Sequence, residues 1–485
     1  MADLTSEGAA LTAPSGKRNF RTIALIIASA MFMEQLDATV LSTALPAMAQ
    51  HFGVSAPHMS IALTSYLLSL AVLIPASGKV ADRFGSRTVF ALAIGVFTLG
   101  SILCAQAPNL PFLVFARFLQ GAGGAMMMPV GRLVLLRSVD KRDLVSATSW
   151  LLVPALVGPI LGPPVGGFIV TYLDWRWIFY INVPIGILGI GLVLAFIENV
   201  KSDTREPFDI VGFILSGIAL ACLLFGFELS SHEGPAVFLA LALVAMGLIT
   251  GTLYVFHARR HPAPILDLSL MRVPTYSLAL VAGSLSRVTQ GAQPFLLPLM
   301  MQIGFGLSAA QSGLLTFATA CGSMLMKGAA AGILRRFGFR TTLIWNSLFS
   351  SALYALCAAF RPDWPHWAIY AVLLVCGFSM SLQFTAFNTV AYDDIPSRRM
   401  SAATSFYTTF QQMMLSLGIC IGALILHASS RIAGHGQPTL DDFSVAFLVV
   451  TAVSLAASPV SALFPADAGA VMSGHKARRG GDAET

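Results

Sequence analysis

Long apolar stretches alternate with short polar connections along almost the whole chain. A helix that crosses a bilayer needs about 20 mostly apolar residues, because the hydrocarbon core is about 30 Å thick and each residue rises about 1.5 Å. Fourteen stretches meet this requirement, with approximate bounds 22–46, 57–77, 88–107, 110–136, 145–171, 177–197, 210–229, 236–257, 275–302, 308–332, 341–360, 366–392, 402–428 and 442–464. Kinks are expected at four prolines inside them, namely Pro129, Pro154, Pro294 and Pro298. The pattern predicts an all-α integral membrane protein with fourteen transmembrane helices.

The composition agrees with this pattern. Of the 485 residues, 56% are hydrophobic and only 11% are charged, and the mean hydropathy is +0.76. A soluble domain carries about 25% charged residues, so a water-soluble chain could not hide this much apolar surface. The composition also excludes disordered, collagen-like, disulfide-scaffold and nucleic-acid-binding classes. The first partner that the chain requires is therefore a lipid bilayer.

Lysine and arginine are distributed unequally between the two sides of the predicted membrane. With the N-terminus placed inside, only three of the 29 Lys and Arg residues fall in outer connections: Arg176, Arg361 and Arg431. Four others fall inside predicted spans: Arg117, Arg132, Arg287 and Lys327. The rest occupy inner connections and tails, which is the positive-inside pattern. We therefore expect both termini to be cytoplasmic.

A short basic segment recurs in the two halves of the chain. Gly78–Arg87 follows the second predicted span, and the similar Ala331–Arg340 follows the tenth, although Asp82 of the first copy is matched by Arg335 of the second. A duplicated six-helix unit with two inserted helices explains the count of fourteen. The predicted organisation is a cytoplasmic tail, a first six-helix half, two inserted helices, a second six-helix half and a cytoplasmic tail, at 1–21, 22–200, 201–260, 261–465 and 466–485.

Other chemistries have little support in the sequence. All six cysteines fall in predicted spans without a CxxC pair, and the nine histidines are scattered. Neither disulfides nor a metal site is predicted. No GxxxxGK[ST] segment occurs, so ATP hydrolysis is unsupported. We expect no cofactor, and no span brings together a nucleophile and a base as an enzyme would require.

Several motifs carry a resemblance to a known family. They lie at Leu36–Pro46, Gly78–Arg87, Arg117–Gly124, Gly158–Gly167 and Trp175–Pro184. They resemble, in turn, the first-helix signature, the loop motif, the fourth-helix motif, the antiporter motif of the fifth helix and the start of the sixth helix in major facilitator superfamily transporters. The chain is most similar to the fourteen-helix drug:proton antiporter family, within a multidrug-resistance exporter subgroup of enteric and related bacteria. This resemblance implies a bacterial inner membrane.

Asp37, Glu34 and Arg117 are the candidates for proton coupling. Asp37 lies near the middle of the first span, and Glu34 lies one turn earlier on the same helical face. Ionisation is expensive at that depth, so Asp37 is expected to carry protons. The alternative is a structural carboxylate bonded to Arg117 or to a hydroxyl. Arg117 needs an anion in the bundle, and the resemblance implies that it takes part in proton transfer; the alternative is a static ion pair.

Two further motifs are expected to control conformation. The resemblance implies that the loop motif forms a latch that stabilises the outward-facing state. The alternative is that its residues only form a turn. They are Gly78, Asp82, Arg83, Gly85 and Arg87. The antiporter motif should kink its helix and pack closely, and the resemblance implies that it shapes the cavity and limits leakage through the transporter. The alternative is that it serves helix packing alone. Its residues are Gly158, Pro159, Gly162, Pro163, Gly166 and Gly167.

The second half departs from exporters of cationic drugs, because its predicted spans carry no acid at mid-depth. It offers basic and amide side chains instead: Arg287, Gln290, Gln293, Lys327, Gln383, Asn388, Gln411 and Gln412. These are the candidates for the substrate cavity. An acid in one half and an arginine in the other suit an anionic, zwitterionic or chelate-like substrate. Each candidate has an alternative role. Arg287 could form an ion pair between the two halves, and Lys327 could extend its side chain to the membrane surface. The glutamines could hold neighbouring helices together.

Three functions remain open at this stage. The leading prediction is a proton-coupled secondary transporter that exports small molecules, in multidrug or toxic-compound efflux, by alternating access. The first alternative is a proton-coupled exporter of an anionic metabolite or metal chelate, such as a carboxylate complex. The second is a facilitator or sensor of the same fold without proton coupling. We expect a monomer whose partners are lipid, a small-molecule substrate and protons, with the proton gradient as energy source and no nucleic acid.

Overall fold

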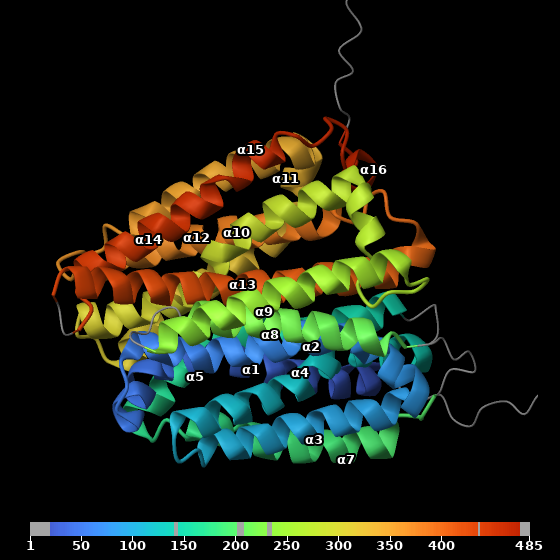
Figure 1. The fold of residues 1–485 in the computed structure, drawn as a ribbon, viewed down its shortest axis with the longest axis horizontal. Helices are drawn as coiled ribbons and strands as arrows, with labels where there is room; N and C mark the ends of the chain where they lie inside the picture. Colours follow the sequence, from blue (N-terminus) through green and yellow to red (C-terminus); the bar gives the residue numbers. More distant parts are fainter. Residues whose placement is uncertain (1–19, 140–143, 201–207, 230–234, 435–436, 476–485) are drawn as a thin grey trace, which may run out of the picture.

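The computed structural model describes residues 20–139, 144–200, 208–229, 235–434 and 437–475, and these form helices joined by short connections (Figure 1). The long helices are α1 (Phe20–Phe52), α2 (Ser60–Phe84), α3 (Ser86–Ala105), α4 (Leu110–Ser138), α5 (Leu144–Tyr172), α7 (Asn182–Phe196), α8 (Ile210–Leu229), α9 (Pro235–Arg260), α10 (Pro274–Leu299), α11 (Ala309–Cys357), α12 (His366–Val390), α13 (Met400–Ile432) and α14 (Leu440–Leu455). The short ones are η1 (Ala56–Met59), α6 (Trp177–Tyr180), η2 (Leu268–Arg272), η3 (Met300–Gly304), η4 (Ser397–Arg399), α15 (Ala457–Ser461) and α16 (Ala470–Ser473).

The described helices provide the predicted number of membrane crossings. Eleven of them are long and apolar enough to span a bilayer. One of the eleven, α11, is two helices that meet at Gly338, whose φ of 72° breaks the helical geometry. Helices α5 and α10 add two more crossings, because each has the required length. The all-α membrane fold with fourteen crossings is therefore confirmed.

Two connections differ from the sequence-based boundaries. Helix α2 continues to Phe84, so most of the predicted loop motif at Gly78–Arg87 is helical. The connection is reduced to Gly85, whose φ of 95° is a left-handed value that favours glycine. The repeated segment in the second half behaves alike, since Gly338 makes the corresponding break inside α11. At both places the short polar segment between two predicted spans is thus reduced to a turn at a single glycine.

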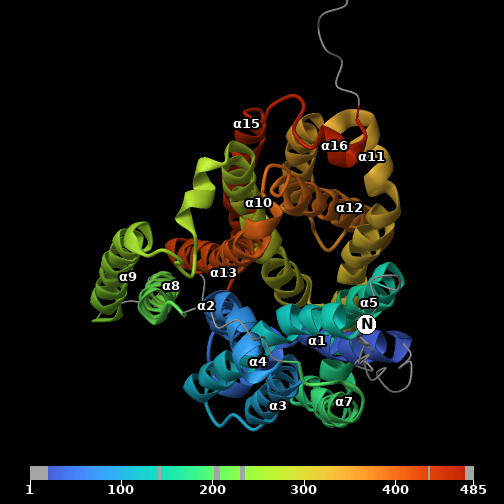
Figure 2. The ribbon, with the colours of Figure 1, turned by 90° about the vertical axis from the view of Figure 1, so that its right-hand side faces the viewer.

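The long helices form two bundles with a helical pair at their side. Figure 2 shows α1–α5 and α7 on one side and α10–α14 on the other. Helices α8 and α9 lie at the edge, where α8 packs on α2 and α13 while α9 packs mainly on α8. We call helices α1–α7 the first bundle and helices α10–α15 the second bundle.

Among the side chains that the structure describes, the two bundles share an apolar core at only one end. One buried cluster joins the α1–α2 region, including Leu45 and Met48, to Phe295 and Met301 of the second bundle. At the other end, where α2 meets α3, each bundle has a buried cluster of its own. We call the first the shared-core end and the second the divided-core end. The two bundles are thus held together mainly at the shared-core end.

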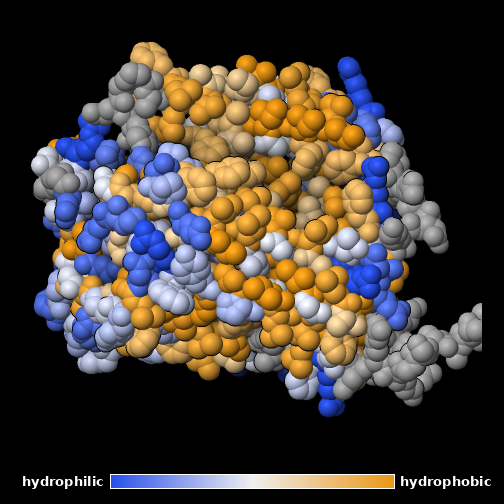
Figure 3. Space-filling model, turned by 90° about the horizontal axis from the view of Figure 1, so that it is seen from below, coloured by the Kyte–Doolittle hydropathy of each residue, from blue (hydrophilic) through white to orange (hydrophobic). Residues whose placement is uncertain are grey.

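The outer surface matches a bilayer. Figure 3 shows a broad apolar area between more polar ends. Large apolar side chains on the peripheral pair are well exposed, including Phe238 at 77% and Leu241 at 62%. An exposed apolar surface of this extent is stable in lipid and unfavourable in water.

Candidate functional site

A carboxylate near the middle of α1 is the centre of a buried polar network. Asp37 is 3% exposed, and its Oδ2 accepts a 2.7 Å hydrogen bond from Arg117 Nη1 on α4. Its Oδ1 accepts hydrogen bonds from Gln120 Nε2 at 2.8 Å and from Asn182 Nδ2 at 3.0 Å. Three donors on two other helices, α4 and α7, therefore surround one acid, as a buried charge requires.

Arg117 is completely buried and is held from several directions. Its Nε donates to the Ala62 carbonyl oxygen at 3.1 Å, and its Nη1 also donates to Gln120 Oε1 at 2.6 Å. The guanidinium carbon lies 4.5 Å from the centroid of the Tyr66 ring, a cation–π arrangement. Its Nη2 and the Tyr66 hydroxyl have no hydrogen-bond partner among the described residues. The site thus retains unused donors next to the ion pair.

Gln120, Asn182 and Ser101 are the members of this network that sequence reasoning missed. The amide of Gln120 donates to both Asp37 and, at 2.8 Å, Ser101 Oγ. Asn182 Nδ2 also donates to Ser101 Oγ at 3.2 Å. Gln120 and Asn182 stand inside the fourth-helix and sixth-helix motifs, which was the available signal. Ser101 on α3 belongs to none of the motifs.

Glu34 lies on α1 close to this network without a described bond to it. The residue is 7% exposed, and its Oε2 has no hydrogen-bond partner among the described residues. A buried carboxyl oxygen without a donor is costly when ionised. Glu34 therefore remains a candidate proton carrier beside Asp37.

The antiporter motif brings α5 into close contact with α1. Three of its glycines face successive turns of α1: Gly158 against Gln35, Gly162 against Thr39 and Gly166 against Thr43. A Cβ atom at Gly166 would lie 2.7 Å from the Val40 carbonyl oxygen, so any larger residue would push the helices apart. Pro159 and Pro163 lie within the same helix, α5.

The opposite side of α5 meets the second bundle at the shared-core end. A Cβ atom added to Gly167 would overlap the Ala309 carbonyl oxygen at the start of α11, and one added to Gly313 would overlap the Pro163 carbonyl oxygen. The Ala310 N–H donates to Thr171 Oγ1 at 2.9 Å. The motif therefore forms part of the contact between the two bundles.

The loop motif ties α2 and α3 to the end of α7. The Ser86 N–H donates to the Val200 carbonyl oxygen at 3.1 Å, and Arg87 Nη1 donates to the Ile197 carbonyl oxygen at 3.4 Å. Asp82 is half-buried, whereas Arg83 is exposed and a Cβ atom on Gly78 would meet nothing within 4 Å. These contacts lie within the first bundle, at the divided-core end.

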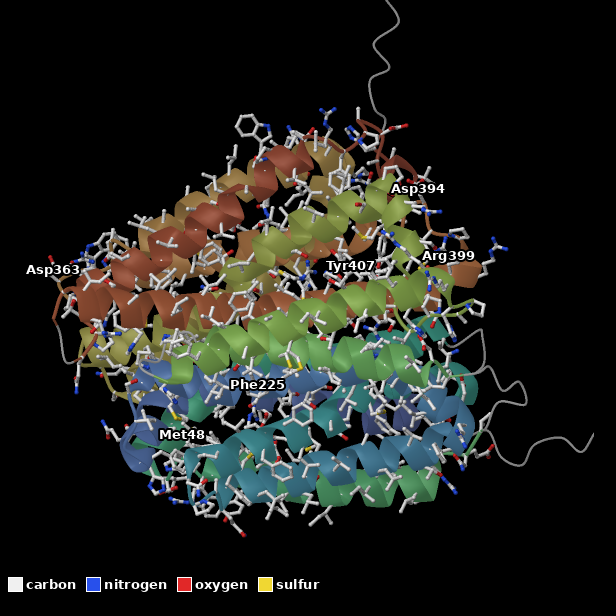
Figure 4. The ribbon with its side chains drawn as sticks, viewed as in Figure 1. Met48, Phe225, Asp363, Asp394, Arg399 and Tyr407 are labelled. Carbon is white, nitrogen blue, oxygen red and sulfur yellow. The ribbon has the colours of Figure 1, made fainter. Side chains whose placement is uncertain are left out.

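Arg287 is a buried cation on α10 that forms no ion pair with any described residue. It is 2% exposed, and its guanidinium carbon lies 5.3 Å and 5.1 Å from the ring centroids of Phe384 and Tyr407. Its Nε and Nη2, as well as the Tyr407 hydroxyl, lack hydrogen-bond partners in the described part of the chain. Tyr407 lies inside the second bundle (Figure 4). Aromatic faces thus stabilise a charge whose donors remain unused.

The other cavity candidates are scattered through the second bundle. Gln290 and Gln293 are buried on α10, and Gln293 Oε1 accepts from the Tyr354 hydroxyl at 3.3 Å. Gln383 Nε2 donates to Ser347 Oγ at 2.7 Å, and Lys327 Nζ donates to Thr385 Oγ1 at 3.2 Å from an exposed position. The remaining three are half-buried: Asn388, which bonds the Phe384 carbonyl of its own helix, and Gln411 and Gln412. No direct bond joins any of these residues to Arg287 in the described part of the chain.

The connection that leads from α9 to α10 is fastened at the divided-core end. Arg399 Nη2 lies 2.7 Å from Asp267 Oδ2, and the Ser269 N–H donates to Asp267 Oδ1 at 3.0 Å. Burial by itself would raise the pKa of Asp267, but the hydrogen bonds from Ser269 and Arg399 outweigh it and hold this pKa below its usual range. The ion pair is therefore maintained down to acidic pH. Arg399 lies at this end and Asp363 at the other (Figure 4).

Glu228 lies near the end of α8, inside the predicted span 210–229, and is 5% exposed. Its Oε1 accepts a 2.6 Å hydrogen bond from Ser60 Oγ of α2, and its Oε2 accepts a 3.4 Å hydrogen bond from Cys420 Sγ of α13. One side chain of the peripheral pair thus contacts both bundles where they meet.

We expect Glu228→Ala to lower thermal stability, because it removes the acceptor for two buried donors. The loss should be about 1–3 kcal/mol, the usual cost of an unsatisfied buried polar group. Thermal unfolding in detergent measures it, with Asp363→Ala at an exposed site as the matched control. Equal melting temperatures for the two variants would show that the contact of Glu228 with both bundles adds no stability.

A bilayer-spanning pair of helical bundles with a buried acid near mid-membrane has the architecture of a secondary transporter. The sequence profile described as "Major Facilitator Superfamily" matches residues 27–419 and 279–480. The chain is 38% identical over 401 residues, 83% of this chain and 85% of the relative, to the "Putative multidrug resistance protein MdtD" of Escherichia coli (strain K12 / DH10B). The same values hold for the protein of that name in Shigella sonnei (strain Ss046).

The chain belongs to the Major Facilitator Superfamily, so it is a membrane transporter and not an enzyme. Solved structures agree on the fold. The POT family transporter PepTSo superposes with a TM-score of 0.67 at 14% identity, covering 92% of this chain and 98% of that one. A D-xylose-proton symporter superposes with a TM-score of 0.64 at 16% identity, covering 91% and 97%.

Proposed function

We propose that this protein is a proton-coupled exporter of small molecules that works by alternating access. The observation that carries the proposal is the Asp37–Arg117 pair, which joins α1 to α4 near the middle of the first bundle and has hydrogen bonds to Ala62 on α2 and Asn182 on α7. An intramembrane acid of this kind is a functional site by default. The relatives named for multidrug resistance support the assignment to efflux.

The proton step follows from the charges of this network. While Asp37 is ionised, it compensates the permanent charge of Arg117. When a proton binds to Asp37, the acid becomes neutral and Arg117 keeps a charge without its anion. The two protonation states therefore favour different arrangements of the site. Substrate can enter from one side of the membrane and protons from the other, and both act on the protonation state of Asp37. The proton gradient therefore supplies the energy, and no cofactor is required.

Alternating access is supported by the unequal core. The bundles share buried apolar residues at one end and have separate clusters at the other. We infer that the centre opens toward the divided-core end, where the bundles share no described apolar cluster and which also carries the basic loop motif. The positive-inside distribution of Lys and Arg supports a cytoplasmic location for that end. We propose a monomer in a bacterial inner membrane, with both termini cytoplasmic and the loop motif as latch.

Reconstitution into vesicles tests the coupling. A lipophilic cation, ethidium, and an organic anion, carboxyfluorescein, serve as probes, first chosen by export from cells stripped of other pumps. We expect an imposed pH gradient to drive the accepted probe uphill, with a matching proton flux reported by a pH-sensitive dye. Flux that is unchanged when an uncoupler collapses the gradient would instead assign the protein to facilitators without proton coupling.

A specific observation favours an anionic substrate as the second candidate. Arg287 is buried and forms no ion pair with the described residues, and its Nε and Nη2 and the hydroxyl of the adjacent Tyr407 have no hydrogen-bond partner among them. A carboxylate on the substrate would accept from both and remove the cost of the buried charge. With an acid in the first bundle and a cation in the second, the centre suits an anionic metabolite or a chelate better than a dication.

We expect Arg287→Gln to raise the KM for carboxyfluorescein by about tenfold or more, because a charge-assisted hydrogen bond contributes about 1.5–3 kcal/mol. Ethidium transport should change little. Arg336→Gln is the control, since Arg336 also stacks on an aromatic ring, Phe337 at 5.4 Å, but is exposed. Unchanged anion transport in Arg287→Gln would exclude this residue from substrate binding and favour lipophilic efflux.

A further inference from the structure

Three potential metal ligands meet where α8 begins and α9 ends. The donor atoms of Asp209, His257 and His261 all lie within 4.8 Å of one another. Asp209 precedes α8 by one residue and is 5% exposed, while both histidines are half-buried. These residues are not part of the network around Asp37 on α1. The sequence showed only scattered histidines and did not indicate that these three residues meet.

The two histidines are arranged on a rigid backbone. They are four residues apart, and the His261 N–H donates to the His257 carbonyl oxygen at 2.9 Å, which continues the helical turn beyond α9. Their ring centroids are 5.2 Å apart at an interplanar angle of 30°. Residues at this spacing share one helical face, and histidines at i and i+4 can bind one metal ion. Arg259 and Arg260, between them, are exposed.

The carboxylate is positioned by the backbone of two other segments. Asp209 Oδ1 accepts from the Gly212 N–H at 2.8 Å, and Oδ2 accepts from the Ile265 N–H at 3.2 Å. His257 Nε2 lies 2.7 Å from the same Oδ1. The carboxylate therefore holds its place without a metal, and among the described residues one lone pair of Oδ2 has no donor.

We propose that Asp209, His257 and His261 form a binding site for a divalent transition metal ion, with Zn²⁺ as the best match. Two imidazole nitrogens and one carboxylate oxygen are a ligand set that Zn²⁺ accepts, with water in a fourth position. Mg²⁺ and Ca²⁺ prefer oxygen ligands and suit the site poorly.

Metal binding requires small local changes. The His257 and Asp209 atoms that now share a hydrogen bond must each turn a lone pair to the ion. Any proton on His257 Nε2 must leave or move to Nδ1 for this nitrogen to bind the ion. The His261 ring accepts one long hydrogen bond, 3.3 Å from the Ala263 N–H to Nδ1, which coordination through that nitrogen would replace.

The site would join three segments around the peripheral pair. Asp209 directly precedes α8, whose other end places Glu228 between α2 and α13. His257 lies in the last turn of α9 and His261 directly follows this helix, while Ile265 belongs to the connection that leads to α10. A bound ion would therefore fix the peripheral pair against the start of the second bundle and stabilise the chain.

Isothermal titration of the purified full-length transporter with Zn²⁺ tests the site, using an affinity tag without histidine. We expect one ion per chain, a rise in melting temperature with Zn²⁺ and none with Mg²⁺. Co²⁺ as a substitute should give the visible absorption bands of a low-symmetry nitrogen–oxygen site.

The principal variant is His261→Ala, because the one hydrogen bond of this ring to a described residue is the long one from Ala263 and its loss should leave the fold intact. We expect the affinity for Zn²⁺ to fall at least about tenfold. Loss of a residue that only hydrogen-bonds to a metal ligand already lowers metal affinity by about this factor, and loss of a ligand itself should lower it no less. His366→Ala, at an exposed helix start, is the matched control. No Zn²⁺ binding by the wild type, or equal binding by His261→Ala, would overturn the proposal. Both readouts are independent of transport, so failure here leaves proton-coupled export untouched.

Discussion

Replacing Asp37 with Asn should abolish transport driven by a pH gradient, down to the rate of protein-free vesicles. Asparagine keeps the shape of the side chain, and its carbonyl oxygen can still accept from Gln120 and Asn182, as Asp37 Oδ1 does now. It cannot bind and release a proton. Arg117 would then have no anion in any state, so the charge switch would be lost.

The assay must distinguish a loss of proton coupling in Asp37→Asn from a loss of folded protein. Exchange of probe across vesicles without a gradient requires only substrate binding and movement of the bundles, so we expect Asp37→Asn to retain it. Loss of a buried partner costs about 3–5 kcal/mol, so melting curves accompany the assay. Asp37→Glu, which keeps a titratable group, should recover part of the uphill transport. The matched control is Asp363→Asn at an exposed position.

Uphill transport by a folded Asp37→Asn protein at the wild-type rate would remove Asp37 from the coupling mechanism. Glu34 would then be the next residue to test, because it is buried on the same helix and its Oε2 has no described donor. The outcome therefore decides between two acids one turn apart.

Replacing Gly167 with Val should open the shared-core end. A Cβ atom at Gly167 would overlap the backbone oxygen of Ala309, and backbone cannot move aside as a flexible side chain does. Overpacking of this kind costs about 1–3 kcal/mol. That cost applies only while α5 touches α11, so the equilibrium should shift roughly 5- to 150-fold toward the state in which this end is separated.

Spin labels on exposed residues of the two bundles measure this shift. Tyr172 and Trp367, at the ends of α5 and α12 on the shared-core side, are 67% and 75% exposed. We expect the distance between them to increase in Gly167→Val, with transport slowed. Gly191→Val on α7 is the matched control, since a Cβ atom there meets nothing within 4 Å. An unchanged distance distribution would mean that this contact does not limit opening.

The sequence by itself determined the fold class and the span count. Apolar stretches of bilayer length are strong signals because every backbone polar group in lipid must be satisfied within a helix. The predicted span 210–229 coincides with α8, and 366–392 ends within two residues of α12. The sequence also singled out Asp37 and Arg117, since charged residues inside spans are rare and conspicuous. Their direct contact was considered, and the structure contains it.

Only the tertiary structure decided which neutral polar residues join that pair. Gln120, Asn182 and Ser101 come from three helices, and nothing in one-dimensional spacing tells a hydrogen-bonding amide from one that packs. The same holds for Glu228, a residue near a helix end that became the contact between both bundles, and for Asp209 with His257 and His261. Periodicity fixes which residues lie in a span, because each helix satisfies its own backbone. Side-chain partners depend on how helices distant in sequence pack, and that is set by the close contacts of glycines such as Gly162 and Gly167.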